Sequence, residues 1–142
     1  MALRPEFTLE TANQRGRGFL PGLFGFRVVG IGDDHLDAEL DVRPEIRAPN
    51  GYLHAASVIA LADTACGYGC LAHLPPDATN FTTIELKTNF LGTAREGTIG
   101  CTARPVHLGR TTHVWDATVY RAKDRRTIAL FRCTQMIIYA AT

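Results

Sequence analysis

A lone carboxylate within a long apolar segment is the residue best placed to do chemistry. Residues 54–73 (HAASVIALADTACGYGCLAH) are rich in alanine and leucine, and Asp63 is the only acidic side chain among them. The segment contains no lysine or arginine, and burying an unpaired carboxylate is costly. We therefore expect either a partner from a distant strand or a pocket lined by Asp63, because perturbed carboxylates concentrate in functional clefts. Helical spacing gives Asp63 these neighbours on its stripe: Ala56, Ile59, Ala60, Cys66, Gly67 and Cys70.

His54 stands at the start of the same segment, directly before Ala55 and Ala56. One interpretation is structural, with the histidine anchoring the preceding loop to the helix. The other is functional, because free backbone N–H groups at a helix N-terminus bind anions or developing oxyanions. Along a helix, His54 and Asp63 stand about 13 Å apart. Both can act on one small reacting group only if two helices from two chains run antiparallel at a shared site, which predicts a dimer.

The elements that must position these residues follow from the hydrophobic pattern. Residues 54–73 form the single long helix, which the prolines at 75 and 76 end. Strands are expected at 24–31, 35–43, 80–91, 97–106, 111–122 and 127–139. A sheet of about six antiparallel strands forms a compact core with one helix only by curling around it, so the predicted fold class is α+β.

Two of these strands have a pattern that assigns faces. In 35–43 the apolar residues alternate and are expected to point inward: Leu36, Ala38, Leu40 and Val42. In 80–91 alternation gives one face to Thr83, Glu85, Lys87 and Asn89.

Length and composition indicate one globular domain of 142 residues with 46% hydrophobic residues and a net charge of +1. This neutrality gives no electrostatic reason to expect nucleic acid or an anionic membrane as a partner. The sequence shows no run of about eighteen apolar residues and no secretory signal, so we expect no membrane span and a cytoplasmic protein. We divide the chain into an N-terminal arm, 1–20, loosely held or forming a short helix, and a single domain, 21–142.

The four cysteines lack the paired spacing of a zinc site or of a disulfide scaffold. They are expected to be buried free thiols, and no metal site is predicted.

Three segments together resemble a known family. NGYLHAASVIALADTACG, TTIELKTNFLGTAREG and PVHLGRTTHVWDATV are similar to the hotdog-fold acyl-CoA thioesterases of the phenylacetate-pathway (PaaI) type. The resemblance implies a hotdog fold, homodimers joined edge to edge, often homotetramers, and hydrolysis of acyl-CoA with no separate cofactor. It implies that Asp63 is nucleophile or general base. The backbone N–H of Ala55, just after His54, would polarise the thioester carbonyl from the neighbouring subunit, and Thr83 would orient water or substrate.

The chain departs from the family pattern at two places. The family has two glycines after the histidine, where this chain has Ala55 and Ala56; the N–H donor is kept, while the methyl group can crowd an acyl chain. The family often has Asn or Gln six residues before the histidine, where this chain has Ala48. Asn50 is the nearest alternative, either as the same polar helper or simply as the turn residue before Gly51.

The resemblance also implies two segments that contact the coenzyme. The first, at the end of strand 80–91, would contact pantetheine through Phe90, Leu91, Gly92 and Thr93. The second would contact the nucleotide and phosphates through His107, Leu108, Gly109, Arg110, Thr111 and Thr112. Its glycine permits close backbone approach and its arginine offers donors to phosphate. The alternative for this second segment is a plain hairpin turn with a solvated arginine.

Three functions stay open at this point. A thioester hydrolase is favoured, a hotdog-fold dehydratase or hydratase shares the scaffold, and a non-catalytic acyl-CoA binder is suggested by Ala55. The acyl group is left open, with Ile59, Gly67 and Tyr68 expected in the floor of the pocket together with residues of the partner subunit.

Overall fold

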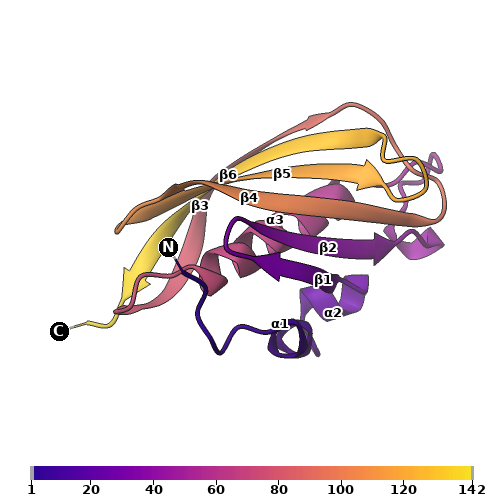
Figure 1. Cartoon of the computed structure of the whole chain (residues 1–142). Helices are drawn as coiled ribbons and strands as arrows, with labels where there is room; N and C mark the ends of the chain where they lie inside the picture. The colour runs from indigo at the N-terminus through magenta and orange to yellow at the C-terminus, as the bar shows by residue number, and fades with distance from the viewer. Residues whose placement is uncertain (1, 142) are drawn as a thin grey trace.

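One 18-residue helix, α3 (Ala55–Ala72), lies across the inner face of a six-stranded antiparallel sheet (Figure 1). This computed structural model describes residues 2–141. The α+β class and the single long helix expected from the sequence are confirmed. In spatial order the strands are β1 (Arg27–Gly32), β2 (His35–Asp41), β4 (Thr98–Leu108), β5 (Thr112–Arg121), β6 (Thr127–Tyr139) and β3 (Ala78–Phe90).

The core lies between α3 and the sheet. From α3 it takes Val58, Leu61, Ala62, Ala65 and Cys66, and from the sheet Leu36, Leu40, Ile99, Trp115 and Val119. The inward faces predicted for Leu36, Ala38 and Leu40 are confirmed. By length and composition alone α3 would also fit a membrane span, which differs from the expectation above. More than half of the helix is buried, as in the core helix of a globular domain.

The N-terminal segment contains the short helix α1 (Leu9–Arg15), and α2 (Leu20–Phe24) crosses the boundary drawn at residue 20. The guanidinium of Arg4 donates to the carbonyl oxygens of Leu74, Pro75 and Ala78 at 2.6–3.3 Å. Ala12 of α1 is fully buried. These contacts fasten the segment to the body of the domain, so it is a packed element and not a loosely held arm.

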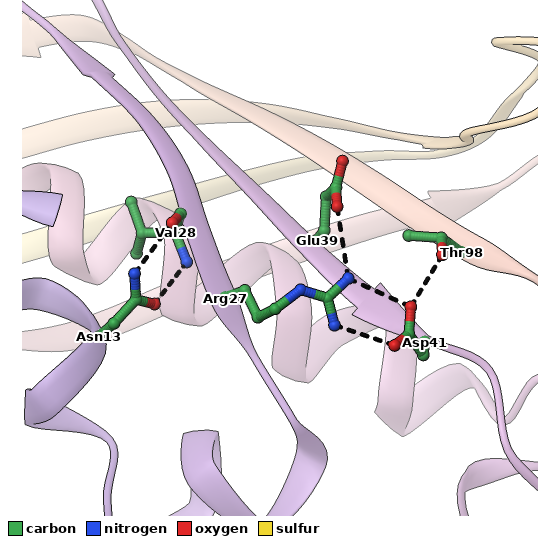
Figure 2. A network of polar contacts seen from close by, with 6 residues as sticks. All are labelled: Asn13, Arg27, Val28, Glu39, Asp41 and Thr98. Atoms are coloured by element: carbon green, nitrogen blue, oxygen red, sulfur yellow. Dashed lines mark hydrogen bonds and ion pairs between the residues drawn. The ribbon is translucent and has the colours of Figure 1, made fainter. Parts of the chain in front are cut away.

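Polar contacts join α1 to the β1 edge of the sheet (Figure 2). The side chain of Asn13 donates to the carbonyl of Val28 at 3.0 Å and accepts from its N–H at 2.8 Å, as a neighbouring strand would. Arg27 donates to both carboxylate oxygens of Asp41 at 3.0 and 3.1 Å, and the Thr98 hydroxyl donates to the same carboxylate at 2.8 Å. This edge is therefore covered and cross-linked.

The opposite edge is β3, which has β6 as its only neighbouring strand among the described residues. A bulge between Thr83 and Glu85 shifts its register, so Glu85, Lys87 and Asn89 share one face as expected, but Thr83 lies on the other. Thr83 pairs with the buried Gln135 and belongs to the inner face, whereas Lys87 pairs with the exposed Arg132 and faces outward. The single extra residue turns the hydroxyl of Thr83 toward α3.

The chain enters α3 through a 3-10 turn, Pro44–Ile46, and a loop with Gly51 in the left-handed region at φ 89°. Ser57, in the first turn of α3, donates to the carbonyl of Ile46 at 2.7 Å and fastens this loop to the helix.

Candidate active site

Asp63 lies halfway along α3 on the side that faces the open edge strand β3. Gly67, one turn further on the same stripe, packs against the ring of Phe81 of β3, and the hydroxyl of Thr83 faces the carboxyl of Asp63. Oδ1 of Asp63 is buried and has no hydrogen-bond partner in residues 2–141. Burial raises the pKa of this carboxyl above its ordinary value, and Thr83 opposes part of the rise. Asp63 therefore lines a partly dry site at the β3 edge.

The side chains expected in the floor of the pocket do not all lie here. Ile59 and Gly67 share the stripe of Asp63, four residues to either side. Tyr68 is about 140° further round the helix and packs edge-on against Phe7 and Phe26, with ring centroids 6.3 and 5.3 Å away. Tyr68 is consequently part of the contact with the N-terminal segment, and its predicted place in the pocket is wrong.

His54 is the N-cap of α3, and its ring Nδ1 accepts from the N–H of Ala56 at 2.9 Å. The N–H of Ala55 has no acceptor among the described residues, and both alanines are exposed. The histidine uses the orphan N–H of Ala56 and leaves the N–H of the preceding residue, Ala55, free for a ligand. A single straight helix keeps Asp63 about 13 Å from this end.

Asn50 makes an Asx turn, in which its Oδ1 accepts from the N–H of Tyr52 at 3.1 Å. Within the chain, Asn50 therefore acts as the turn residue before Gly51. Thr93 comes to the same loop, where its hydroxyl accepts from the N–H of Leu53 at 3.3 Å. The first coenzyme segment and the start of α3 are thereby brought together, although 40 residues separate Leu53 from Thr93.

The two coenzyme segments lie at opposite ends of the sheet (Figure 1). Phe90 pairs with Ala129, whereas Thr112 pairs with Met136, seven residues further along β6. Seven strand residues span about 24 Å. Within one chain the segments 90–93 and 107–112 are therefore too far apart to surround one pantetheine arm.

At the end near Ala55, Phe90 and Leu91 are exposed to 46% and 59%. The N–H groups of Leu91 and Gly92 donate to the carbonyl of Ile128 at 2.8 and 3.2 Å, which fixes the turn. A cleft of about 230 Å³ beside it is lined by Gly92, Thr93, Arg121, Arg126 and Ile128. Two arginines thus adjoin the predicted pantetheine segment, and the sequence reasoning missed both.

At the other end, residues 109–111 form the hairpin between β4 and β5. The N–H of Gly109 donates to the carbonyl of Thr112 at 2.9 Å, and the Tyr139 hydroxyl donates to the carbonyl of Arg110 at 2.6 Å. The guanidinium of Arg110 is exposed and lies 5.6 Å from the centre of the Tyr139 ring. His107 and Thr111 are also exposed. The structure therefore confirms the hairpin turn given above as the alternative, and the exposed guanidinium of Arg110 stays accessible to a ligand.

A thiol and an imidazole lie side by side in the core, a pair of groups that can form a nucleophile in other proteins. Sγ of Cys70 lies 3.4 Å from Nδ1 of His113. Burial raises the pKa of the thiol to about 12 and lowers that of the imidazole to about 4. Both groups are neutral at physiological pH, so the pair holds no thiolate. All four cysteines are buried and free, as predicted.

Gln135 is a further polar residue that the sequence reasoning missed. It is fully buried, and its Oε1 accepts from the Thr83 hydroxyl at 2.8 Å. The signal was present in β6, whose inward positions are otherwise apolar or small: Ala129, Phe131, Cys133 and Ile137. A glutamine in that series is buried by the alternation itself.

Known proteins resemble the chain in sequence and in structure. The model of the Thioesterase superfamily matches residues 50–128, more than half of the chain. The 1,4-dihydroxy-2-naphthoyl-CoA hydrolase of Escherichia coli K12 is 30% identical over 128 residues, covering 88% of this chain and 91% of the relative. The putative esterase ComA2 of Bacillus subtilis is 37% identical over 90 residues, covering 63% and 71%.

A crystal structure of a mutant of the thioesterase PA1618 from Pseudomonas aeruginosa superposes with a TM-score of 0.92 at 26% identity, covering 99% of this chain and all of that one. The hotdog fold expected from the resemblance is thereby confirmed. A half-buried carboxylate, an exposed helix N-terminus and a fold shared along the whole length agree with the sequence match: the chain belongs to the Thioesterase superfamily and is a thioester hydrolase.

Proposed function

We propose that the protein hydrolyses acyl-CoA thioesters to the free acid and coenzyme A, with Asp63 as the catalytic carboxylate. The observation that carries this is the Asp63 carboxyl itself, which is half-buried, has an unpaired oxygen and faces the open edge of the sheet. The hydrolase from Escherichia coli has an acyl-CoA as its named substrate, which supports the class of substrate. We assign the chain to the PaaI type and to the cytoplasm, as expected from the sequence.

The chemistry follows one of two routes. As a general base, Asp63 takes a proton from water while the water oxygen bonds to the thioester carbon. As a nucleophile, its own oxygen bonds to that carbon and forms an anhydride, which water then cleaves. In both, negative charge develops on the carbonyl oxygen, where the free N–H of Ala55 stabilises it. The C–S bond breaks, and the coenzyme leaves as a thiolate that takes up a proton. Thr83 orients the carboxyl or the water.

We propose that the site is shared between two subunits of a homodimer. In one chain Ala55 and Asp63 are too far apart to touch one carbonyl, and the two coenzyme segments lie at opposite ends of the sheet. Antiparallel pairing of β3 with the β3 of a second copy, about a two-fold axis, reverses the second chain. The Ala55 end of one chain then meets the Arg110 hairpin of the other, and Asp63 lies between them. Two such dimers back to back would give the homotetramer.

Asp63→Asn is the decisive variant. The side chains are nearly isosteric, so we expect an unchanged fold, retained binding of a non-hydrolysable acyl-CoA analogue, and a fall in kcat of about 10²-fold or more. The measurement is release of free thiol from a panel of aromatic and aliphatic acyl-CoAs. Thr64→Ser is the matched control, because Thr64 is the next residue of α3 and lines a small cleft with Leu20 and Phe24 of α2. Near-normal turnover in folded Asp63→Asn protein would overturn the proposal.

The raised pKa gives the same variant a stability signature. A carboxyl whose pKa is higher in the folded than in the unfolded protein binds more protons when folded, so its contribution to stability falls as pH rises through the folded pKa. Asp63→Asn removes this penalty. We expect its melting temperature to match or exceed that of the wild type at pH 7, with the difference vanishing in acid. A carboxylate held for structure predicts the opposite.

Complementation tests the shared site directly. Ala55→Pro removes the proposed oxyanion donor, and Asp63→Asn removes the carboxylate. In a mixed dimer of the two variants, one site combines an intact Ala55 with an intact Asp63 from different chains. Random mixing therefore restores about a quarter of the wild-type activity. A site contained within one chain would restore none.

A single turnover in ¹⁸O-water separates the two routes. When water cleaves the anhydride at the carbonyl carbon of Asp63, the label enters the carboxyl of Asp63, and label found there identifies the nucleophilic route. With a general base, the label enters the product directly. Peptide mass spectrometry of residues around position 63 reads out the difference.

A further inference from the structure

Gln135 is a fully buried amide on β6, the strand next to the open edge strand β3, and nothing in the proposed chemistry uses it. It lies on β6 opposite Thr83 of β3 and opposite His113 of β5. Burial of a polar side chain costs free energy unless its hydrogen bonds are made. An apolar residue at this inward position would pack as its neighbours do, so the amide indicates a role beyond packing.

The hydrogen bonds of Gln135 lead to Thr83, whose hydroxyl faces the carboxyl of Asp63. The Thr83 hydroxyl donates to Oε1 of Gln135 at 2.8 Å, and Nε2 of Gln135 donates to Sγ of Cys133 at 3.3 Å. A hydroxyl has one proton, so a Thr83 that donates to Gln135 offers only lone pairs to the carboxyl that it faces. This arrangement suits a protonated Asp63, whose own O–H can donate to Thr83.

A half-turn of the amide reverses the whole chain. The NH₂ group then donates to Oγ1 of Thr83, and the hydroxyl proton is free to donate to Asp63. The amide oxygen in its new place accepts from the Cys133 thiol, so the amide stays paired. The reversed arrangement suits the ionised carboxylate, and it supplies the partner that Oδ1 of Asp63 lacks. The two orientations of one amide therefore correspond to the two protonation forms of the reacting group.

We propose that Gln135 is a positioning residue: the orientation of its amide sets the direction of the Thr83 hydrogen bond, so that the hydroxyl donates to Asp63 when the carboxylate is the reacting form. This inference rests on the function proposed above. Gln135 touches no substrate and acts through Thr83 alone.

Other titratable groups near the chain stay neutral in the pH range that matters. They are the thiols of Cys66 on α3 and Cys101 on β4 and the imidazole of His113 on β5. The thiol of Cys133 on β6 accepts from the amide of Gln135. Burial raises the pKa of Cys66 and Cys101 and lowers that of His113 to about 4. No lysine or arginine among the described residues shifts the pKa of Asp63. Thr83 is thus the group that favours the ionised form of Asp63, against the effect of burial.

Gln135→Met tests the role, because methionine keeps the length and removes both polar atoms. A hydrogen-bond chain that ends on a carboxylate is charge-assisted, so its loss weakens the ionised form more than the neutral one. We expect the acid limb of the kcat/KM profile to move up by about one pH unit. Thr83→Val moves it at least as far, Thr83→Ser leaves it in place, and Gln135→Met adds nothing in a Thr83→Val background.

Ile137→Val is the matched control, because Ile137 is buried on the same face of β6 two residues away. It lowers stability without moving the acid limb. If Gln135→Met lowers the melting temperature and leaves the limb in place, or if its shift adds to that of Thr83→Val, the role is overturned.

Carbon-13 titration of the Asp63 carboxyl, assigned with Asp63→Asn, gives a readout free of activity. The same upward shift is expected in Gln135→Met, and an unmoved titration would overturn the role. A wild-type protein that releases no thiol from any acyl-CoA would refute the proposed function, while the titration would still decide on Gln135.

Discussion

The two ends of α3 both carry a histidine, but one end is open and the other is sealed. At the start, His54 is exposed and accepts a single hydrogen bond, from Ala56. At the end, His73 is fully buried, with its ring nitrogens 2.8 and 2.9 Å from the carbonyl oxygens of Gly69 and Asp33. Its ring also lies 5.4 Å from that of Trp115. The same residue type closes both ends of one helix in different surroundings.

The difference shows which polar groups are available to a ligand. At the sealed end the backbone and side-chain groups are bonded to one another, and Arg4 covers the carbonyls that follow the helix. At the open end the Ala55 N–H has no acceptor among the residues described. A helix end without partners in its own chain is a red flag for stability unless water or a ligand completes it. Chemistry is therefore expected at the open end and stability at the sealed one.

Trp115→Ala should give the largest effect, and it should be on stability. The indole is fully buried against Gly69, so truncation removes its contacts and leaves a cavity, at a cost of about 3–5 kcal/mol. Urea unfolding measures the loss. Turnover per folded molecule should stay close to wild type. A loss of kcat without loss of folded protein would contradict the assignment of chemistry to one end of α3 and stability to the other.

Ala55→Pro should give the largest effect on turnover. Proline suits the first helical position, and His54 already has the extended backbone, φ −64° and ψ 137°, that a residue before proline requires. The substitution removes the free N–H and little else. We expect kcat to fall about 10²–10³-fold with an unchanged melting temperature. Ala55→Gly, which keeps the N–H, is the control, and equal losses in both would exclude the N–H as the cause.

The two histidines should differ when each is removed. His73→Leu removes the buried ring that contacts the carbonyls of Gly69 and Asp33, and the loss of its N–H donor costs about 1–3 kcal/mol. His54→Ala loses one exposed cap, at about 1 kcal/mol, and His54→Asn, which offers a side-chain oxygen to the Ala56 N–H, should restore it. Chemical denaturation gives both values. If His73→Leu and His54→Ala lowered the free energy of unfolding by similar amounts, burial would not be the property that distinguishes the two helix ends.

The glycines of α3 should give the smallest and finest contrast. A methyl group at Gly69 would lie 2.7 Å from the Trp115 ring, which is enclosed, and at Gly67 it would lie 2.9 Å from the tip of the Phe81 ring, which is half-exposed. Crowding costs about 1–3 kcal/mol and the gain in helix propensity offsets about 1. We expect Gly69→Ala to lower the melting temperature and Gly67→Ala to leave it nearly unchanged. If Gly67→Ala were the more destabilising change, the Phe81 ring on the β3 side would be the less yielding neighbour of the helix.

Local patterns in the sequence determined the long helix, the inward residues of β2 and the buried thiols. Each depends on a periodicity or a burial preference that a short segment carries by itself. The isolation of Asp63 was visible in the same way, because an acidic residue in an apolar helix needs no structure to be noticed.

The tertiary structure alone decided which of these residues meet. A one-residue bulge in β3 moved Thr83 to the inner face, against simple alternation, and Gln135 gained the Thr83 hydroxyl as a partner only through pairing with a strand 52 residues away. The antiparallel sheet placed the two predicted coenzyme segments at opposite ends, which is the reason for proposing a site shared by two chains. Register and edge are properties of the whole sheet, because every strand must satisfy its neighbours at once, and no single segment contains that information.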